Sequence, residues 1–275
     1  MPAVSRIDLV VTDLDGTLWH TSDIDALHPR IAAAVDEVQR RGHGLLVATG
    51  RRLASTRDPL RRFGLEPPAV VLNGAMVVDL ATDERIHRHA FTADDAADVL
   101  GHFLDAGIEP CIYVEHDEVD VFVSDNPSTH PEHLRSFGEW ARVADLSDVV
   151  AGEAILAFGV LSLPADEIVR VYEKVGDIAN AHLSDERQYA GGMTLTVAPP
   201  ELSKWDGMEA FCAARGYDPT RVLAIGDGPN DLELLDGAAV AVVPDDGHVD
   251  ALARADHVVP RALDGGWADL LDLLD

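Results

Sequence analysis

Short, almost wholly apolar runs alternate with amphipathic stretches in the first third of the chain. The runs IDLVVTDLD (7–15) and GLLVATGR (44–51) have the length and β-branched content of strands buried on both faces of a parallel sheet. Between them, HPRIAAAVDEVQRRG (28–42) places apolar residues at helical spacing, with a proline near its start and a glycine at its end. The segment LASTRDPLRRFG (53–64) predicts a second helix, and AVVLNGAMVVD (69–79) predicts a strand, a turn at Asn-Gly and a returning strand.

The pattern changes between residues 83 and 191 and then returns. Strand-like and helical segments alternate there with loops rich in Pro, Ser and His, such as SDNPSTHPEH (124–133). After Ser203, helical and strand-like segments again follow one another, ending in a predicted helix through GGWADLLDLLD (265–275). We therefore expect an α/β protein with a doubly wound, Rossmann-like parallel sheet formed by residues 1–82 and 192–275. Residues 83–191 are expected to form an inserted α/β cap domain.

The composition argues against nucleic acid as a binding partner. The chain of 275 residues carries a formal net charge of −28, so it lacks the Lys and Arg clusters that bind nucleic acid. Of its basic residues only Lys174 and Lys204 are lysines. Such a surface suits a cytosol of high ionic strength, which suggests a halophilic source; a GC-rich genome that favours Arg, Ala and Asp codons is an equal alternative.

Cysteine usage and hydropathy suggest where the protein works. Cys111 and Cys212 lie far apart and outside any metal-binding spacing, which indicates reduced thiols in a cytoplasmic protein. No apolar run is long enough to cross a bilayer, and the N-terminus has no signal-peptide pattern. We expect no membrane partner, and a monomer or homodimer.

Polar residues of one chemical kind follow three of the predicted strands. Asp13 and Asp15 follow the first strand, Thr49 follows the second, and Asp227 ends the strand-like segment RVLAIGD. Ligands bind beyond the carboxyl ends of the strands in such sheets, so these side chains are expected to converge. Converging carboxylates repel one another unless a cation compensates them, and Mg²⁺ prefers oxygen ligands. Lys204, just before the segment that delivers Asp227, is a second source of positive charge.

Four short motifs in this order carry a resemblance to a known family. They are DLDGT (13–17), ATGR (48–51), SK (203–204) and GDGPND (226–231). Together they resemble the four motifs of the haloacid dehalogenase superfamily, most closely its Cof-type branch of sugar-phosphate phosphatases. The likeness spans roughly residues 5–82 and 192–275, and the segment between them falls where that branch carries a cap over the active site.

The resemblance implies a Mg²⁺-dependent phosphatase that works through an aspartyl-phosphate. Asp13 corresponds to the nucleophile and Asp15 to the general acid/base. The metal would be held by the carboxylates of Asp13 and Asp227 and the backbone carbonyl of Asp15, while Lys204 stabilises the charge of the nucleophile. The partner would be a small phosphorylated metabolite, by resemblance a sugar phosphate or similar compound.

The remaining motif residues are given supporting roles by the same resemblance. Asp231 would hold Lys204 or metal-bound water without binding the metal itself. Phosphoryl oxygens would be bound by Thr49 and by backbone N–H groups around Leu14 and Gly50, and Asn230 would reach a phosphate or substrate oxygen.

Structural alternatives exist for several of these positions. Thr49 could instead cap the following helix, and Asn230 and Asp231 could cap the helix NDLELL. Arg51 and Asn73 also match family positions, but a surface ion pair and a turn residue explain them equally well. The runs EHDE (115–118) and HPEH (130–133) lack zinc-motif spacing, and we interpret them as solvated loops.

Three other functions compete with a sugar-phosphate phosphatase. A phosphomutase of the phosphomannomutase type shares such a core, but it must hold a second phosphate with its cap, where basic residues are few. A phosphatase of the phosphoglycolate type is another candidate. A non-catalytic binding protein on the same fold would be expected to have lost Asp13, Asp15 or Lys204, and all three are present.

Overall fold

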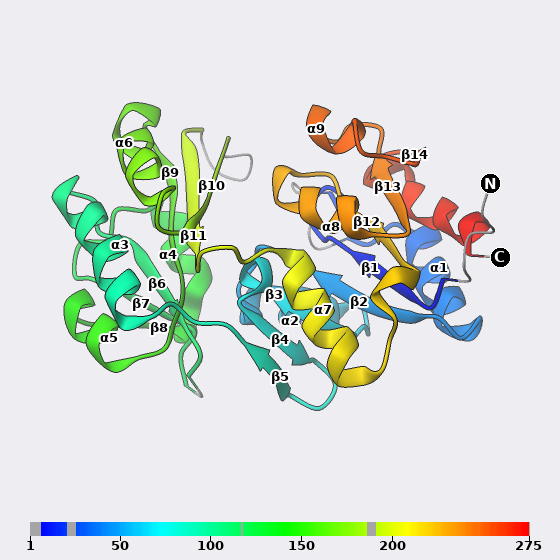
Figure 1. The fold of residues 1–275 in the computed structure, drawn as a ribbon, viewed down its shortest axis with the longest axis horizontal. Helices are drawn as coiled ribbons and strands as arrows, with labels where there is room; N and C mark the ends of the chain where they lie inside the picture. The colour runs from blue at the N-terminus through cyan, green and yellow to red at the C-terminus, as the bar shows by residue number, and fades with distance from the viewer. Residues whose placement is uncertain (1–6, 21–25, 117, 186–190, 275) are drawn as a thin grey trace. The chain divides into compact units, whose positions relative to one another are not determined.

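The computed structural model describes the chain except residues 1–6, 21–25, 117, 186–190 and 275 (Figure 1). Contacts between residues divide it into two compact units. The first comprises Met1–Arg51, Ser55–Arg88 and Ser203–Asp275, and the second comprises Arg52–Ala54 and His89–Leu202.

The first unit is built on an eight-stranded sheet with the order β14-β13-β12-β1-β2-β3-β4-β5. The strands from β14 to β3 are parallel, and β4 and β5 continue the sheet in antiparallel pairs. Their bounds are β1 Leu9–Thr12, β2 Gly44–Ala48, β3 Pro68–Val71, β4 Met76–Asp79, β5 Glu84–Arg88, β12 Val222–Ile225, β13 Val240–Pro244 and β14 His257–Val259. The central strands β1 and β12 are buried along their whole length, as expected for a sheet covered on both faces.

Helices on both sides of this sheet supply its core. On one side α7, α8 and α9 pack on the face of the sheet that carries Leu9, Val11 and Leu46. Helix α1 contacts β2 and the 3₁₀ helix η6. The bounds are α1 Pro29–Arg40, α2 Leu53–Arg62, α7 Lys204–Arg215, α8 Leu232–Gly237, α9 Val249–Leu252 and η6 Gly266–Leu273.

The second unit is a six-stranded sheet with the order β10-β11-β9-β6-β7-β8, antiparallel except between β7 and β8. Its core contains Phe103 and Phe158, whose rings stack at 6.1 Å. The bounds are α3 Ala93–Asp105, β6 Cys111–Val114, β7 Val121–Val123, α4 Pro131–Phe137, β8 Ala141–Val143, α5 Leu146–Gly152, β9 Ile155–Leu163, α6 Ala165–Val175, β10 Asn180–Asp185 and β11 Met193–Ala198.

The α/β class with a parallel sheet is confirmed, as is the return of the chain after Asn73–Gly74, where β3 and β4 pair antiparallel across the 3₁₀ turn η1 (Leu72–Gly74). The boundaries expected at residues 82 and 192 fall just before β5 and β11. In the structure β5 pairs with β4 of the first sheet, and β11 pairs with β9 and β10 of the second.

One local expectation was wrong, and another was met by a different type of helix. The run HPEH is not wholly a loop, because α4 begins at Pro131 and the His130 ring accepts a hydrogen bond from the backbone N–H of Glu132 as its N-cap. The C-terminal segment is helical but forms the 3₁₀ helix η6. Among the described residues, no helix is both long and apolar enough to span a membrane.

Candidate active site

Asp13 is the first residue after β1, the strand between β2 and β12 in the first sheet. Its backbone N–H donates to the carbonyl of Ile225 at 2.9 Å, which continues the ladder between the two strands. Its carbonyl accepts from the hydroxyl of Thr12 at 2.7 Å, and that hydroxyl accepts from the indole N–H of Trp267 at 2.9 Å. Thr12 and Trp267 are both buried. The carboxylate is therefore held on a rigid strand at the carboxyl edge of the sheet.

Lys204 reaches this carboxylate from the first turn of α7. The helix begins with a capping box, in which Ser203 and Asp206 bond to one another's backbone N–H groups. The Lys204 Nζ donates to Asp13 Oδ1 at 2.7 Å and to Asp231 Oδ1 at 2.7 Å. Its side chain is fully buried. A buried ammonium with two carboxylate acceptors is positioned for charge stabilisation, unlike a surface lysine.

Burial is the largest single influence on the pKa values of Asp13 and Lys204. Burial raises the pKa of Asp13 well above its ordinary value, Lys204 opposes the rise, and the carboxylates of Asp231, Asp227 and Asp15 add to it. Burial also disfavours the charge on Lys204, but Asp13 and Asp231 outweigh it and raise the pKa of the ammonium. Negative charge therefore exceeds positive charge in the cluster, and a bound cation would favour the ionised form of Asp13.

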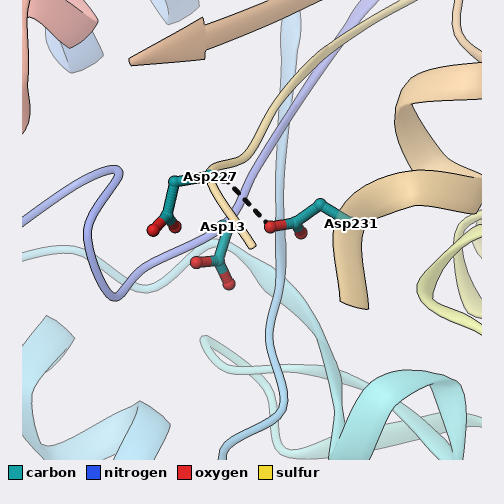
Figure 2. Close-up of side chains that lie close together, drawn as sticks. All are labelled: Asp13, Asp227 and Asp231. Carbon is teal, nitrogen blue, oxygen red and sulfur yellow. Dashed lines mark hydrogen bonds between the residues drawn. The ribbon is translucent and has the colours of Figure 1, made fainter. Parts of the chain in front are cut away.

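Asp227 and Asp231 come from the loop after β12. The nearest carboxylate oxygens of Asp13, Asp227 and Asp231 all lie within 4.8 Å of one another. Figure 2 shows the three side chains as neighbours, with the hydrogen bond from the Asp227 backbone to Asp231. Gly16 lies against Asp227, with φ at +86°, and a Cβ there would collide with the Asp227 carboxylate. Glycine at this position thus permits both the turn and the close approach.

The carboxylates of the two aspartates in this loop accept hydrogen bonds from different donors. Asp231 accepts three hydrogen bonds: Oδ1 accepts from Lys204, and Oδ2 accepts from the backbone N–H groups of Asp227 and Gly228 at 3.1 and 2.9 Å. Asp227 Oδ1 accepts from the hydroxyl of Thr17 at 3.1 Å. Asp231 therefore secures Lys204 and the loop, and its side chain does not serve as the N-cap acceptor of α8.

The donor set fits a hard divalent cation. Oxygen ligands from carboxylates suit Mg²⁺, and a cluster with more carboxylates than ammonium groups has negative charge left to neutralise. The carboxylates of Asp13, Asp227 and Asp231 together are therefore a candidate site for such an ion.

Asp15 lies outside this three-carboxylate group. Its carboxylate forms an ion pair with Arg51, whose Nη2 donates to Oδ1 at 2.6 Å and whose Nε donates to Oδ2. The indole N–H of Trp19 also donates to Oδ1, at 3.0 Å. Arg51 thus forms an ion pair, as its alternative interpretation expected, but its side chain is only 16% exposed and its partner is Asp15.

Thr49 and Gly50 occupy the loop after β2. Thr49 is buried, and its hydroxyl accepts from the backbone N–H of Arg51 at 3.2 Å. It lies four residues before α2 begins, so it does not cap that helix. Asn230 donates to the Asn73 side chain at 2.9 Å, and a Cβ on Gly50 would lie 3.0 Å from the same Asn73 oxygen. The loops after β2, β3 and β12 therefore meet here.

Leu14 can contribute through its backbone alone, because its side chain is fully buried. Its carbonyl accepts from the backbone N–H groups of Thr17, Leu18 and Trp19, which closes the turn that follows Asp13. This turn carries Asp15 and Trp19 on one compact loop.

Sequence reasoning missed Trp19 and Trp267, and it left Arg51 and Asn73 undecided. One signal was available for the two tryptophans. A tryptophan near the end of a loop or beside a buried strand needs an acceptor for its indole N–H, and Asp15 and Thr12 are polar residues close to the first strand.

Together these features define a doubly wound α/β protein with an acidic site at the end of its sheet, in which Lys204 pairs with two of the carboxylates. A family model for haloacid dehalogenase-like hydrolases matches residues 10–271, and the chain belongs to this family. The fold and the resemblance noted from the four motifs therefore agree.

Two curated relatives span most of the chain. A phosphoglycolate phosphatase from Methanopyrus kandleri is 26% identical over 236 residues, which cover 86% of this chain and 83% of the relative. A phosphoglycolate phosphatase from Haloarcula marismortui is 26% identical over 264 residues, which cover 94% of each chain.

Solved structures share the fold at lower identity. A phosphatase of the haloalkanoate enzyme superfamily from Bacteroides thetaiotaomicron has a TM-score of 0.78 and 20% identity, covering 99% of this chain and 96% of its own. A sugar phosphatase of subclass IIB of the same superfamily has a TM-score of 0.74 and 19% identity, covering 97% of this chain and 98% of its own. Subclass IIB is the Cof-type branch to which the motifs pointed.

Proposed function

We propose that this protein is a Mg²⁺-dependent phosphatase that hydrolyses small phosphomonoesters through an aspartyl-phosphate on Asp13. The observation that carries the proposal is the buried Asp13 carboxylate, hydrogen-bonded by Lys204 at 2.7 Å beside the carboxylate of Asp227. A structural ion pair would not need an extra carboxylate beside it, whereas phosphoryl transfer needs a nucleophile, a cation and counter-charge together.

The chain's residues divide the reaction into two steps. In the first, an Asp13 oxygen bonds to phosphorus, the bond between phosphorus and the alcohol oxygen breaks, and Asp15 gives the departing oxygen a proton. In the second, Asp15 takes a proton from water as the water oxygen bonds to phosphorus and Asp13 is released. Lys204 stabilises the negative charge on Asp13 throughout, and Asp231 holds Lys204 in place.

The carboxylates of Asp13 and Asp227, with the backbone carbonyl of Asp15, are the groups we assign to Mg²⁺. When bound, the ion neutralises charge on the phosphoryl oxygens. We do not assign Asp231 to the ion, because its carboxylate already accepts hydrogen bonds from Lys204 and two backbone N–H groups.

We assign the binding of the phosphoryl oxygens to the loops that meet at Asn73. Thr49, the backbone N–H groups of Leu14 and Gly50, and the amide of Asn230 are the donors we propose. The hydrogen bond of 2.9 Å between Asn230 and Asn73 supports this, because it fixes Asn230 beside Gly50.

The substrate class is a small phosphorylated metabolite. The sugar phosphatase among the structural neighbours favours sugar phosphates, and the two phosphoglycolate phosphatases among the relatives favour phosphoglycolate as a second candidate. The division into a core (1–82, 192–275) and a specificity-setting cap (83–191) remains part of the proposal. A panel with sugar phosphates and 2-phosphoglycolate, assayed over a range of KCl concentrations, separates these substrates and also tests the halophilic origin.

One assay tests the central proposal. With p-nitrophenyl phosphate, we expect hydrolysis that requires Mg²⁺ and is abolished by EDTA, and a loss of at least about 1,000-fold in kcat in Asp13→Asn. Circular dichroism would check that the variant is folded. If the wild-type protein releases no phosphate with Mg²⁺, or if Asp13→Asn is as active as wild type, the proposal is wrong. Bisphosphate-dependent conversion of a hexose 6-phosphate to its 1-phosphate would instead identify a phosphomutase.

A further inference from the structure

Trp19 is folded back onto Asp15 by the turn that follows the first strand. The backbone N–H of Gly16 donates to the Trp19 carbonyl at 2.8 Å, and the backbone N–H of Trp19 donates to the Leu14 carbonyl at 3.0 Å. Asp15 and Trp19 also form an isolated β-bridge. The indole is buried, with only 1% of the residue exposed, and its Nε1–H donates to Asp15 Oδ1. A buried indole N–H therefore has the carboxylate as its acceptor.

Arg51 holds the same carboxylate from the opposite loop. Its guanidinium makes a two-pronged contact with Asp15, Nη2 to Oδ1 and Nε to Oδ2. The guanidinium carbon also lies 5.6 Å from the centroid of the Trp19 ring. Trp19 thus contacts both members of the ion pair, donating to one and lying beside the other.

The two oxygens of Asp15 differ because of Trp19. Among the described residues, Oδ1 accepts from two donors, Trp19 and Arg51, whereas Oδ2 accepts from Arg51 alone. A carboxylate oxygen has about two positions at which it can accept a hydrogen. Both positions on Oδ1 are filled, and one on Oδ2 remains.

We propose that Trp19 is a positioning residue that reserves Oδ2 of Asp15 for the proton exchanged with the substrate. The inference rests on the proposed function, in which Asp15 is the acid and base. In phosphoryl transfer, the proton on Oδ2 moves to the departing alcohol oxygen. In hydrolysis, a proton from the attacking water returns to Oδ2, so Asp15 is restored. Trp19 is a donor only and keeps its proton in both steps.

A purely structural role for Trp19 is the competing explanation. Its ring packs near Phe63, with centroids 6.2 Å apart, so its loss could disturb the loop without any link to proton transfer. Such a disturbance would slow the reaction of every substrate. A role through Asp15 would slow mainly substrates whose leaving group needs a proton.

Two aromatic substrates of similar size separate these explanations. p-Nitrophenyl phosphate has a leaving group that departs as an anion, whereas the alkoxide leaving group of benzyl phosphate needs a proton. For Trp19→Phe we expect kcat/KM to fall about tenfold with benzyl phosphate and less than about threefold with p-nitrophenyl phosphate. Trp140→Phe in the second unit is the matched control and should change neither value.

A double-mutant cycle with Asp15→Asn adds the decisive comparison. Asp15→Asn alone should show a larger selective loss with benzyl phosphate, and adding Trp19→Phe should cause no further selective loss. If Trp19→Phe unfolds the loop, replacing Trp19 with benzothienylalanine keeps the ring shape and removes only the N–H.

The outcomes distinguish a failure of the role of Trp19 from a failure of the proposed function. Equal losses with both substrates in the Trp19 variants, or a full extra selective loss in the double variant, overturn the role of Trp19 and leave the phosphatase proposal intact. If the wild-type protein hydrolyses neither ester with Mg²⁺, the proposed function itself fails.

Discussion

The two units of this protein bury charge in different arrangements. In the first unit, Lys204 and the aspartates that it contacts are buried at the end of a sheet. In the second, Arg52 is buried and pairs with the carboxylate of Asp120 at 2.8 Å, and Phe158 is fully buried between Phe91 and Phe103 in an uncharged core cluster. Buried charges are costly unless each is paired, while close-packed aromatic rings stabilise a fold directly.

The difference indicates whether the interior of each unit contributes to activity or to stability. In the charge cluster of the first unit two carboxylates share one ammonium, an arrangement that costs stability and that the proposed phosphoryl transfer would use. The interior of the second unit combines a packing core with an ion pair in which Arg52 and Asp120 balance one another. Removing a charged partner should therefore affect the first unit in both activity and stability, and metal binding should act on the first unit alone.

The largest effect is expected from Lys204→Met. Without the ammonium, Asp13 and Asp231 remain buried without counter-charge, so the free energy of unfolding should fall by roughly 3–5 kcal/mol. Activity should fall by at least about 100-fold, because charge on the nucleophile is no longer stabilised. Urea unfolding and the p-nitrophenyl phosphate assay measure the two effects, and Mg²⁺ should restore part of the stability.

The matched control for this prediction is the other lysine. Lys174 is exposed on α6, and Lys174→Met should change the unfolding free energy by less than about 0.5 kcal/mol. Equal effects of the two substitutions would mean that Lys204 does not balance the buried carboxylates.

A smaller effect is expected in the second unit from His133. Its Nε2 lies 3.3 Å from the hydroxyl of Tyr113, and burial, with the charges of Arg52 and His130, lowers its pKa from 6.5 to about 4. The unfolded chain binds a proton here below pH 6.5, whereas the folded protein does so only near pH 4. The stability that His133 contributes is therefore complete above pH 6.5 and is lost as the pH falls towards 4.

His133→Gln measures this contribution. Between pH 7 and pH 5 the wild-type protein should lose about 2 kcal/mol more unfolding free energy than the variant, as followed by urea titration. His87→Gln, at an exposed position on β5, is the control and should keep the wild-type pH dependence. Parallel curves for wild type and His133→Gln would show that the ring is not held neutral.

The sharpest comparison comes from the cysteines, since each unit contains one. Both thiols are buried, and burial raises the pKa of Cys111 to about 12 and that of Cys212 to about 11. Neither should react with a thiol reagent at pH 8 until its unit opens. With Mg²⁺ at 100 times its dissociation constant, labelling of Cys212 should slow by about 100-fold and labelling of Cys111 should not change. Equal slowing would mean that the units open together.

The polar residues at the strand ends of the site could be predicted from short stretches of sequence. Asp13, Thr49 and Asp227 each follow an apolar run, and parallel strands bring such positions to one edge of the sheet. Lys204 was recognisable because lysine is so rare in this chain. These inferences needed only chain pattern and topology.

The finer arrangement depends on contacts that pattern does not encode. Asn230 and Asn73 are 157 residues apart in the chain, and Arg51 and Asp15 are 36 apart. Which donors a carboxylate selects depends on its side-chain rotamer and its neighbours in space. The division expected at residues 82 and 192 depends on contacts of the same kind: whether β5 and β11 belong to one sheet or the other is decided by strand pairing, and the apolar pattern is the same in either case.

The pairing of Asp13 with Lys204 also sets an order of events during protein synthesis. The two residues are 191 positions apart, so at ribosomal rates of about 5–20 residues per second the aspartate waits about 10–40 s for its counter-charge. Residues 89–202 of the second unit are all synthesised in that interval. The packing core can therefore fold on the ribosome first, and the acidic site of the first unit is completed only after Lys204 has emerged.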